Sequence, residues 1–152
     1  MPVINVLTGI PASGKSTFAK GLSGFILNST ALRPLIGATA GNKADDVRVF
    51  RILRRLAEYH CRQSHEIVVD ATNLTVLQRQ SWVQISKRYD YTCVCYWFDN
   101  NLSLAMTINA QRERKVPRDR MILYNSIFEA PSPDEGFSSI IRIDVQELFA
   151  TE

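Results

Sequence analysis

Nine residues near the start of the chain, GIPASGKST at positions 9–17, have the spacing of a phosphate-binding loop. The pattern GxxxxGK[ST] is filled by Gly9, Gly14, Lys15 and Ser16. Glycines let successive backbone N–H groups turn toward a phosphate, the lysine ammonium reaches the β- and γ-phosphates, and the serine hydroxyl completes a Mg²⁺ shell. The loop therefore predicts a nucleoside triphosphate site. Its expected contacts are Gly9, Ile10, Pro11, Ala12, Ser13, Gly14, Lys15, Ser16 and Thr17.

A carboxylate that could share the metal ends a short apolar run further along the chain. The segment EIVVD at 66–70 is typical of a buried parallel strand whose last residue, Asp70, faces a ligand. In phosphoryl-transfer sites such a carboxylate organises Mg²⁺ and its water shell. We therefore assign Ser16 and Asp70 as the metal-binding residues.

A basic segment, RERKVPRDR at 112–120, carries five positive and two negative charges. It could be a solvated turn. Its place after a predicted strand and helix, in a chain with a phosphate loop, favours a lid whose arginines close on the transferring phosphate.

A second group of arginines lies on the clearest predicted helix, at 45–64. Helical geometry puts these arginines within about 60° of one another, on a different face from the expected core. They form either a solvated helix face or a track for a nucleic-acid phosphate backbone. The arginines are Arg48, Arg51, Arg55 and Arg62, and the expected core face is Val49, Phe50, Leu53, Leu56, Ala57 and His60.

The elements that must position these residues alternate between strand and helix. Apolar runs predict strands, and periodic apolar positions with caps predict helices. Pro34 is expected to keep any helix from running through Arg33, and the segment at 92–98, apolar on both faces, to be a central strand. The order predicts an α/β fold with a doubly wound, mainly parallel sheet and helices on both faces. Expected strands are 3–8, 25–28, 66–70, 92–98 and 139–143, and expected helices are 16–22, 45–64, 76–88, 102–111 and one whose first residue is Pro117.

Length and composition limit the organisation of the chain. With 152 residues, 45% of them hydrophobic, we expect a single domain over 1–152. No stretch approaches the roughly 18 apolar residues of a membrane span, and no signal peptide is evident, so we expect a cytoplasmic protein. Cys61, Cys93 and Cys95 lack zinc-site spacing, which favours buried thiols. The net charge of +3 permits a polyanionic partner without requiring one.

Taken together, the chain resembles the phosphate-loop kinases of the polynucleotide 5′-kinase type, which include the kinase domains of phage and bacterial end-healing enzymes. The likeness rests on the loop and its helix at 9–20, on DATNL at 70–74, and on the lid series Asn109, Arg112, Val116 and Pro117. FEAPSPDEGF at 128–137 resembles the closing loop of related small AAA-type predicted kinases.

The resemblance implies ATP and Mg²⁺ as cofactors and a nucleic acid 5′-end as the partner. It implies that Lys15 and Asp70 are catalytic and that Arg112 binds the nucleotide and stabilises charge on the transferred phosphate. Arg33 would contact the phosphate beside the acceptor 5′-hydroxyl. With the arginine stripe taken as a phosphate track, the residues expected to bind the acceptor are Thr30, Arg33, Arg51 and Arg55.

Two positions depart from this family's pattern. The family's general base, an Asp three residues before the acceptor arginine, is Thr30 here, and its first lid arginine is Ile108. Neither side chain can take over the role, because threonine cannot accept a proton at neutral pH and isoleucine cannot neutralise charge. Three hypotheses follow: a kinase of a nucleic-acid 5′-hydroxyl, a kinase of a small nucleoside or metabolite, and a weakly or non-catalytic ATP-binding protein. The arginine stripe and Arg33 support the first, whereas Thr30 and Ile108 support the third.

Overall fold

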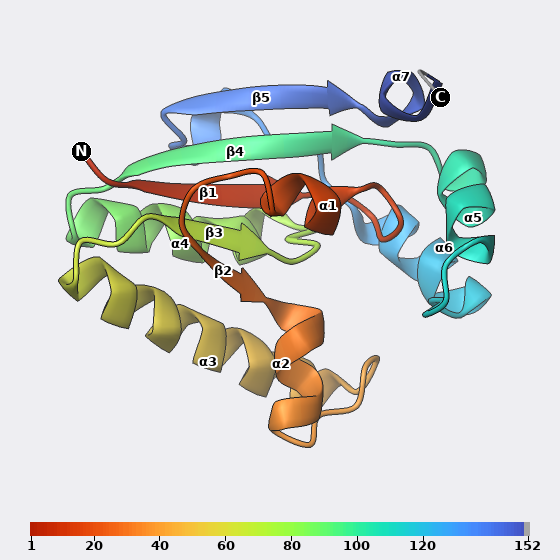
Figure 1. Cartoon of the computed structure of the whole chain (residues 1–152), viewed down its shortest axis with the longest axis horizontal. Helices are drawn as coiled ribbons and strands as arrows, with labels where there is room; N and C mark the ends of the chain where they lie inside the picture. Colours follow the sequence, from red (N-terminus) through yellow and green to blue (C-terminus); the bar gives the residue numbers. More distant parts are fainter. Residues whose placement is uncertain (151–152) are drawn as a thin grey trace.

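The structure, a computed structural model, describes residues 1–150 and contains one sheet of five parallel strands. The strands lie in the order β2-β3-β1-β4-β5. In Figure 1 their arrowheads all point toward the same end of the sheet, so the carboxyl ends of the strands meet there. The predicted doubly wound α/β fold is confirmed. The strands are β1 (Val3–Thr8), β2 (Phe25–Asn28), β3 (Ile67–Asp70), β4 (Thr92–Asp99) and β5 (Ser139–Asp144).

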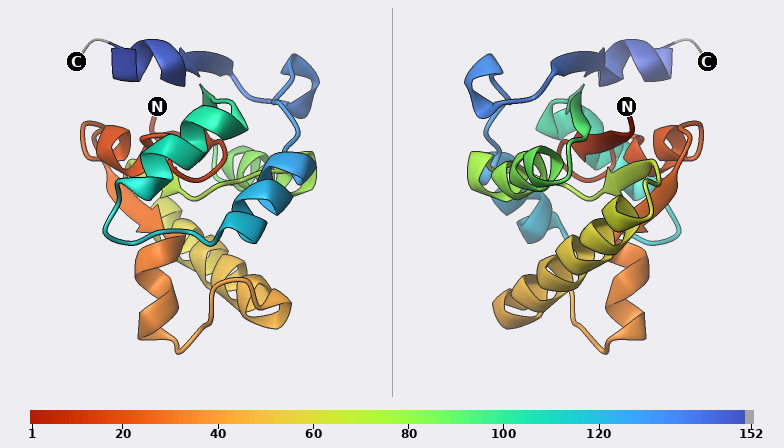
Figure 2. Two further views of the ribbon diagram at one scale, coloured as in Figure 1. Left: turned by 90° about the vertical axis from the view of Figure 1, so that its right-hand side faces the viewer. Right: turned by 90° about the vertical axis from the view of Figure 1, so that its left-hand side faces the viewer.

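Helices cover both faces of the sheet. On one face, α3 (Lys43–Arg62) and α4 (Val76–Arg88) pack in a core that includes Trp82. On the other face, α1 (Lys15–Ala19) and α7 (Val145–Ala150) pack around Phe98. Figure 2, which looks along the strands, shows α1 and α4 on opposite sides.

The remaining elements lie mostly beyond the carboxyl ends of the strands (Figure 1). Helix α2 (Ser29–Leu35) follows β2 directly, and α5 (Leu102–Ala110) follows β4. Helix α6 (Arg118–Ile127) comes next, and a 3₁₀ turn, η1 (Pro133–Glu135), precedes β5. The candidate residues for chemistry are therefore concentrated where these segments meet.

The bounds of α3 and α5 differ from the sequence prediction by one or two residues, and three other helices differ for reasons that can be named. Helix α2 runs through Arg33 and includes Pro34, because the fixed φ of proline is helical and the helix ends one residue later. Helix α1 ends at Ala19, and the chain then continues in tight turns through Gly21, a weak helix former. Pro117 is the N-cap of α6 rather than its first residue, because its ψ of 146° is extended.

The prediction that 92–98 is a central strand is confirmed, because β4 is an interior strand lying between β1 and β5. One expectation about the core was wrong. Leu56 was expected in the core of α3 but is 37% exposed. The buried side chains of α3 follow an i, i+4 stripe, and Leu56 falls at its margin. That stripe consists of Val49, Leu53, Ala57 and Cys61.

Cys61, Cys93 and Cys95 are buried free thiols, as predicted. Burial raises the pKa of Cys61 to about 11 and those of Cys93 and Cys95 to about 12. All three therefore stay protonated and unreactive near neutral pH. None of the helices within residues 1–150 has both the length and the hydropathy that a membrane crossing requires.

A histidine pair lies where α3 ends and β2 and β3 begin. The Nδ1 atoms of His60 and His65 are 3.0 Å apart, and Phe25 stacks on His60 with 4.4 Å between ring centroids. A hydrogen bond between two Nδ1 atoms requires one to be protonated and the other not. Burial, followed by the charge of His65, lowers the pKa of His60.

We expect thermal stability to fall as pH drops below about 6.5, the ordinary histidine pKa. Because the pKa of His60 is lower in the folded than in the unfolded state, the unfolded chain binds more protons in acid. The contribution of His60 to stability is fully present above its pKa in the unfolded state. It is lost as pH falls through its pKa in the folded state. Melting temperatures between pH 7.5 and 5 should fall more steeply in the parent than in a His60→Gln, His65→Gln variant, which has no histidine. Equal slopes would contradict the prediction.

Candidate functional site

The loop from Gly9 to Thr17 joins β1 to α1 at the carboxyl end of the sheet. Gly9 has a φ of 154°, and a Cβ there would lie 2.8 Å from the Phe98 carbonyl oxygen. Gly14, with a φ of 86°, is the N-cap of α1, and no side chain in the described structure caps this end. The first N–H groups of α1 therefore face the loop without an intrahelical partner. The backbone path requires both motif glycines.

Lys15 is folded back onto the loop. Its Nζ donates to the carbonyl oxygens of Gly9 at 2.9 Å and Ile10 at 2.8 Å, and the residue is 8% exposed. Burial lowers the pKa of Lys15 from 10.5 to about 8, with the Asp70 carboxylate raising it and the Arg112 guanidinium lowering it. The ammonium is therefore still mainly charged at neutral pH and lies within electrostatic range of both residues.

Ser16 and Asp70, both predicted to bind the metal, are joined by a hydrogen bond. Ser16 Oγ donates to Asp70 Oδ2 at 2.8 Å, and Asp70 is 4% exposed. Asn28 Nδ2 also donates to Asp70 Oδ2, at 2.7 Å. Asn28 and Asp70 are register partners at the ends of β2 and β3, so the sheet itself places them side by side.

Thr30 and Arg33 lie on α2, the short helix that follows β2. Asn28 Oδ1 caps α2 by accepting a backbone N–H of its first turn at 2.8 Å, so one side chain ties this helix to Asp70. Thr30 is exposed in the first turn. Arg33 is half-buried, and its Nη1 lies 2.5 Å from Asp46 Oδ1 on α3. The guanidinium thus has a carboxylate partner in this structure.

The segment predicted as a lid joins α5 to α6. Asn109, 7% exposed, holds it at both polar groups of Val116: Nδ2 donates to the carbonyl oxygen at 2.8 Å, and Oδ1 accepts the N–H at 3.0 Å. Arg112 is exposed on this segment, and its charge reaches Lys15. Ile108 is partly buried and packs against two apolar clusters of the core.

Arg51 and Arg55 are exposed on α3 and are not brought into the cluster around Lys15 and Asp70. Figure 1 shows α3 starting near α2 and running back along the sheet toward the opposite end. Arg48, on the same face, donates to Asp45 and to the Ile36 carbonyl oxygen. The stripe therefore leads away from α2 and from the cluster around Lys15 and Asp70.

Sequence reasoning missed three residues of this region. Asn28 was the last residue of a predicted strand, a position that could have indicated its role. Asn100 follows β4, and its Nδ2 lies 3.1 Å from Ser13 Oγ in the phosphate loop. Its place after a strand was a similar signal. Asp46 had no signal, because its contact with Arg33 depends on how α2 packs on α3.

Most of the chain matches the sequence model of a known family. The profile of the AAA domain matches residues 4–131. The chain belongs to the AAA domain family. Sequence similarity also links this AAA domain protein to two kinases. It is 25% identical over 145 residues to the bifunctional polynucleotide phosphatase/kinase of Schizosaccharomyces pombe, with 92% of this chain and 33% of that protein covered.

The second relative is the L-seryl-tRNA(Sec) kinase of Methanococcus maripaludis, 24% identical over 157 residues, with 94% of this chain and 62% of that protein covered. The chain thus spans 33% and 62% of the lengths of these two relatives. Among solved structures, the Mycobacterium tuberculosis APS kinase CysC in complex with AMPPNP and APS matches with a TM-score of 0.70 and 20% identity, covering 98% of this chain and 96% of that one. This likeness shows a phosphate-loop kinase fold.

Proposed function

We propose that this AAA domain protein is an ATP-dependent phosphotransferase that passes the γ-phosphoryl group to the 5′-hydroxyl of a polynucleotide. The observation that carries the proposal is the convergence of Lys15, Ser16 and Asp70 beside the cap of α2, with Lys15 and Asp70 buried and Ser16 exposed. The two kinase relatives support phosphoryl transfer as the reaction class.

The donor set at Ser16 and Asp70 fits Mg²⁺. A hydroxyl and a carboxylate oxygen, 2.8 Å apart, are the hard oxygen donors that this ion prefers. When bound, Mg²⁺ would supply charge neutralisation on the β- and γ-phosphates. Asn28 helps to orient the carboxylate, because its amide donates to the same oxygen as Ser16.

The phosphate contacts would come from the loop and from two cations. The N–H groups at the start of α1 face the loop, and Lys15 already points its ammonium at loop carbonyl oxygens. Phosphate oxygens would be stronger acceptors for that ammonium, because both partners are then charged. Arg112, on the segment held by Asn109, would add positive charge at the transferred group.

On the acceptor side, the hydroxyl would lie at Thr30 and the adjacent phosphate at Arg33. Asp46 competes for Arg33, so binding an acceptor phosphate requires the guanidinium to exchange or share this partner. Thr30 cannot take the hydroxyl proton. Phosphoryl transfer relies mainly on positioning and electrostatics, and a general base adds about 10²- to 10⁴-fold, so we expect a slow kinase.

A transfer assay with radiolabelled γ-phosphate of ATP tests the proposal against its alternatives. Label on a 5′-hydroxyl DNA or RNA oligonucleotide would support it. Label on a free nucleoside alone would favour the small-acceptor kinase. ATP binding without transfer to any acceptor would favour the non-catalytic alternative, for which Thr30 and the Arg33–Asp46 pair are the structural arguments.

We expect binding of a single-stranded oligonucleotide to weaken as salt rises, and Arg51→Glu, Arg55→Glu to weaken it further. Both arginines are exposed on α3, and phosphate contacts release counterions. Lys20→Glu, Lys87→Glu is a matched control, because it changes net charge equally at two exposed residues elsewhere. Fluorescence anisotropy of a labelled oligonucleotide, recorded across salt concentrations, measures the affinity of the parent and of both variants. Affinity that is flat with salt, or equal loss in the control, would contradict a role for the α3 stripe.

A further inference from the structure

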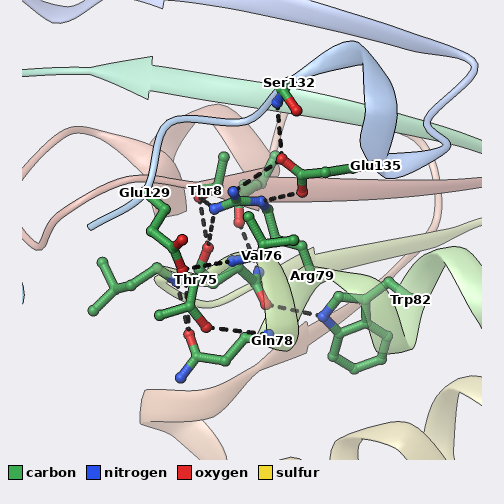
Figure 3. A network of polar contacts seen from close by, with 12 residues as sticks. Thr8, Thr75, Val76, Gln78, Arg79, Trp82, Glu129, Ser132 and Glu135 are labelled. Atoms are coloured by element: carbon green, nitrogen blue, oxygen red, sulfur yellow. Dashed lines mark hydrogen bonds and ion pairs between the residues drawn. The ribbon is translucent and has the colours of Figure 1, made fainter. Parts of the chain in front are cut away.

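Arg79, on the second turn of α4, is fully buried, and each of its three guanidinium nitrogens donates a hydrogen bond (Figure 3). Its Nε and Nη2 donate to the two carboxylate oxygens of Glu135, at 2.8 and 3.1 Å. Its Nη1 donates to the Asn73 carbonyl oxygen at 3.0 Å and to Thr8 Oγ1 at 3.3 Å. Glu135 belongs to η1, and its side chain is 4% exposed.

The two partners of Nη1 lie beside the two segments of the site. Thr8 immediately precedes Gly9 of the phosphate loop, and Asn73 follows Asp70 by three residues. They are also bonded directly, since Thr8 Oγ1 donates to the Asn73 carbonyl oxygen at 2.7 Å. Asn73 Nδ2 donates to the Leu7 carbonyl oxygen at 2.7 Å. Arg79 therefore sits on the junction that holds the loop against the Asp70 turn.

The segment at 129–135, which carries Glu135, also contacts the junction between the phosphate loop and the Asp70 turn. The Ser132 N–H donates to Glu135 Oε2 at 2.8 Å, which fixes the carboxylate within its own turn. Upstream, Glu129 Oε1 accepts the N–H of Val76 at the start of α4, at 3.2 Å. The stretch from 129 to 135 is thus anchored on α4 at two points, and Glu135 is the one that reaches the Arg79 guanidinium.

A buried ion pair is a poor source of net stability, because desolvation of both charges offsets much of their attraction. A planar guanidinium with four fixed acceptors is, however, a strong constraint on geometry. We propose that Arg79 and Glu135 are positioning residues for the phosphoryl-transfer site, an inference that rests on the proposed function. They set the distance between the phosphate loop and Asp70, and with it the Ser16–Asp70 metal pair.

The test uses Glu135→Gln, which keeps the size of the side chain but turns one acceptor oxygen into an amide donor facing the guanidinium. We expect kcat to fall about 10- to 100-fold while the KM for the acceptor changes little, because small misplacement of reacting groups slows the chemical step. The Mg²⁺-dependent gain in affinity for a fluorescent ATP analogue should shrink as well. Glu58→Gln is the matched control, since it removes the charge from the Arg88–Glu58 ion pair between α3 and α4 and should change neither quantity.

A second variant keeps the test decisive if Glu135→Gln does not fold. Thr8→Val is isosteric and removes the hydroxyl at the far end of the network, so the same two losses are expected. Combined with Glu135→Gln, its effect should be less than additive, because both act through Arg79.

If the role of the pair is purely structural, the variants should have a lower melting temperature. The folded fraction that binds ATP should then keep the parental kcat and the parental Mg²⁺-dependent gain in affinity for the ATP analogue. That result would overturn the inference. If the parent protein transfers phosphate to no acceptor, the proposed function fails. The positioning role is then tested only by the Mg²⁺-dependent gain in affinity for the ATP analogue. A reduced gain in Glu135→Gln and Thr8→Val would support positioning, and an unchanged gain would refute it.

Discussion

Lys15→Ala is expected to reduce phosphoryl transfer by at least about 10²- to 10³-fold, the loss typical of removing one preorganised charge-stabilising group. The ammonium is buried, still charged at neutral pH, and already held at the loop by two carbonyl oxygens. Removing it leaves the N–H groups of the loop without the cation that would span the β- and γ-phosphates. Transfer rate and ATP affinity, measured in the presence of Mg²⁺, should both fall.

Two further variants separate charge from packing. Lys15→Met retains most of the buried volume without the charge, so it should behave like Lys15→Ala. Lys20→Ala removes a lysine that is exposed just after α1, and it should leave transfer unchanged. Full activity in folded Lys15→Ala would exclude the proposed phosphotransferase.

The sequence predicted the features that depend on local pattern. The strand at 3–8 and the capped helix α4 were placed correctly, because apolar runs and side-chain caps act over a few residues. Thr75 and Gln78 form the full capping box at the start of α4. The glycine positions of the phosphate loop also follow from local backbone geometry, as the φ of Gly14 shows.

Contacts between distant segments could not be read in the same way. The pairing of Arg33 with Asp46 depends on how α2 packs on α3. Ile108 looked like a missing lid charge in sequence, whereas the structure places it against the core beneath α5. The Arg79–Glu135 pair joins residues 56 positions apart, and no local pattern of either segment indicates it.

The environment of Thr30 makes Thr30→Asp a gain-of-function experiment. Thr30 is exposed in the first turn of α2, and an acidic side chain there is favoured by the positive end of the helix. The substitution should therefore be tolerated by the fold. Ile108→Arg is a less direct way to restore the family pattern, because it would place a charge against apolar clusters.

With a carboxylate at position 30, transfer to a 5′-hydroxyl should rise by about 10²-fold or more, the lower range of general-base catalysis. ATP affinity should change little, because the phosphate loop is untouched. Ser29→Asp is the matched control: it adds the same charge to the same helix turn, one residue away. A gain confined to Thr30→Asp would indicate proton transfer, and an equal gain in both would indicate a general electrostatic effect. If Thr30→Asp binds ATP and folds but is no faster than the parent, Thr30 does not face the acceptor hydroxyl, and the assignment of a polynucleotide acceptor loses its mechanistic basis.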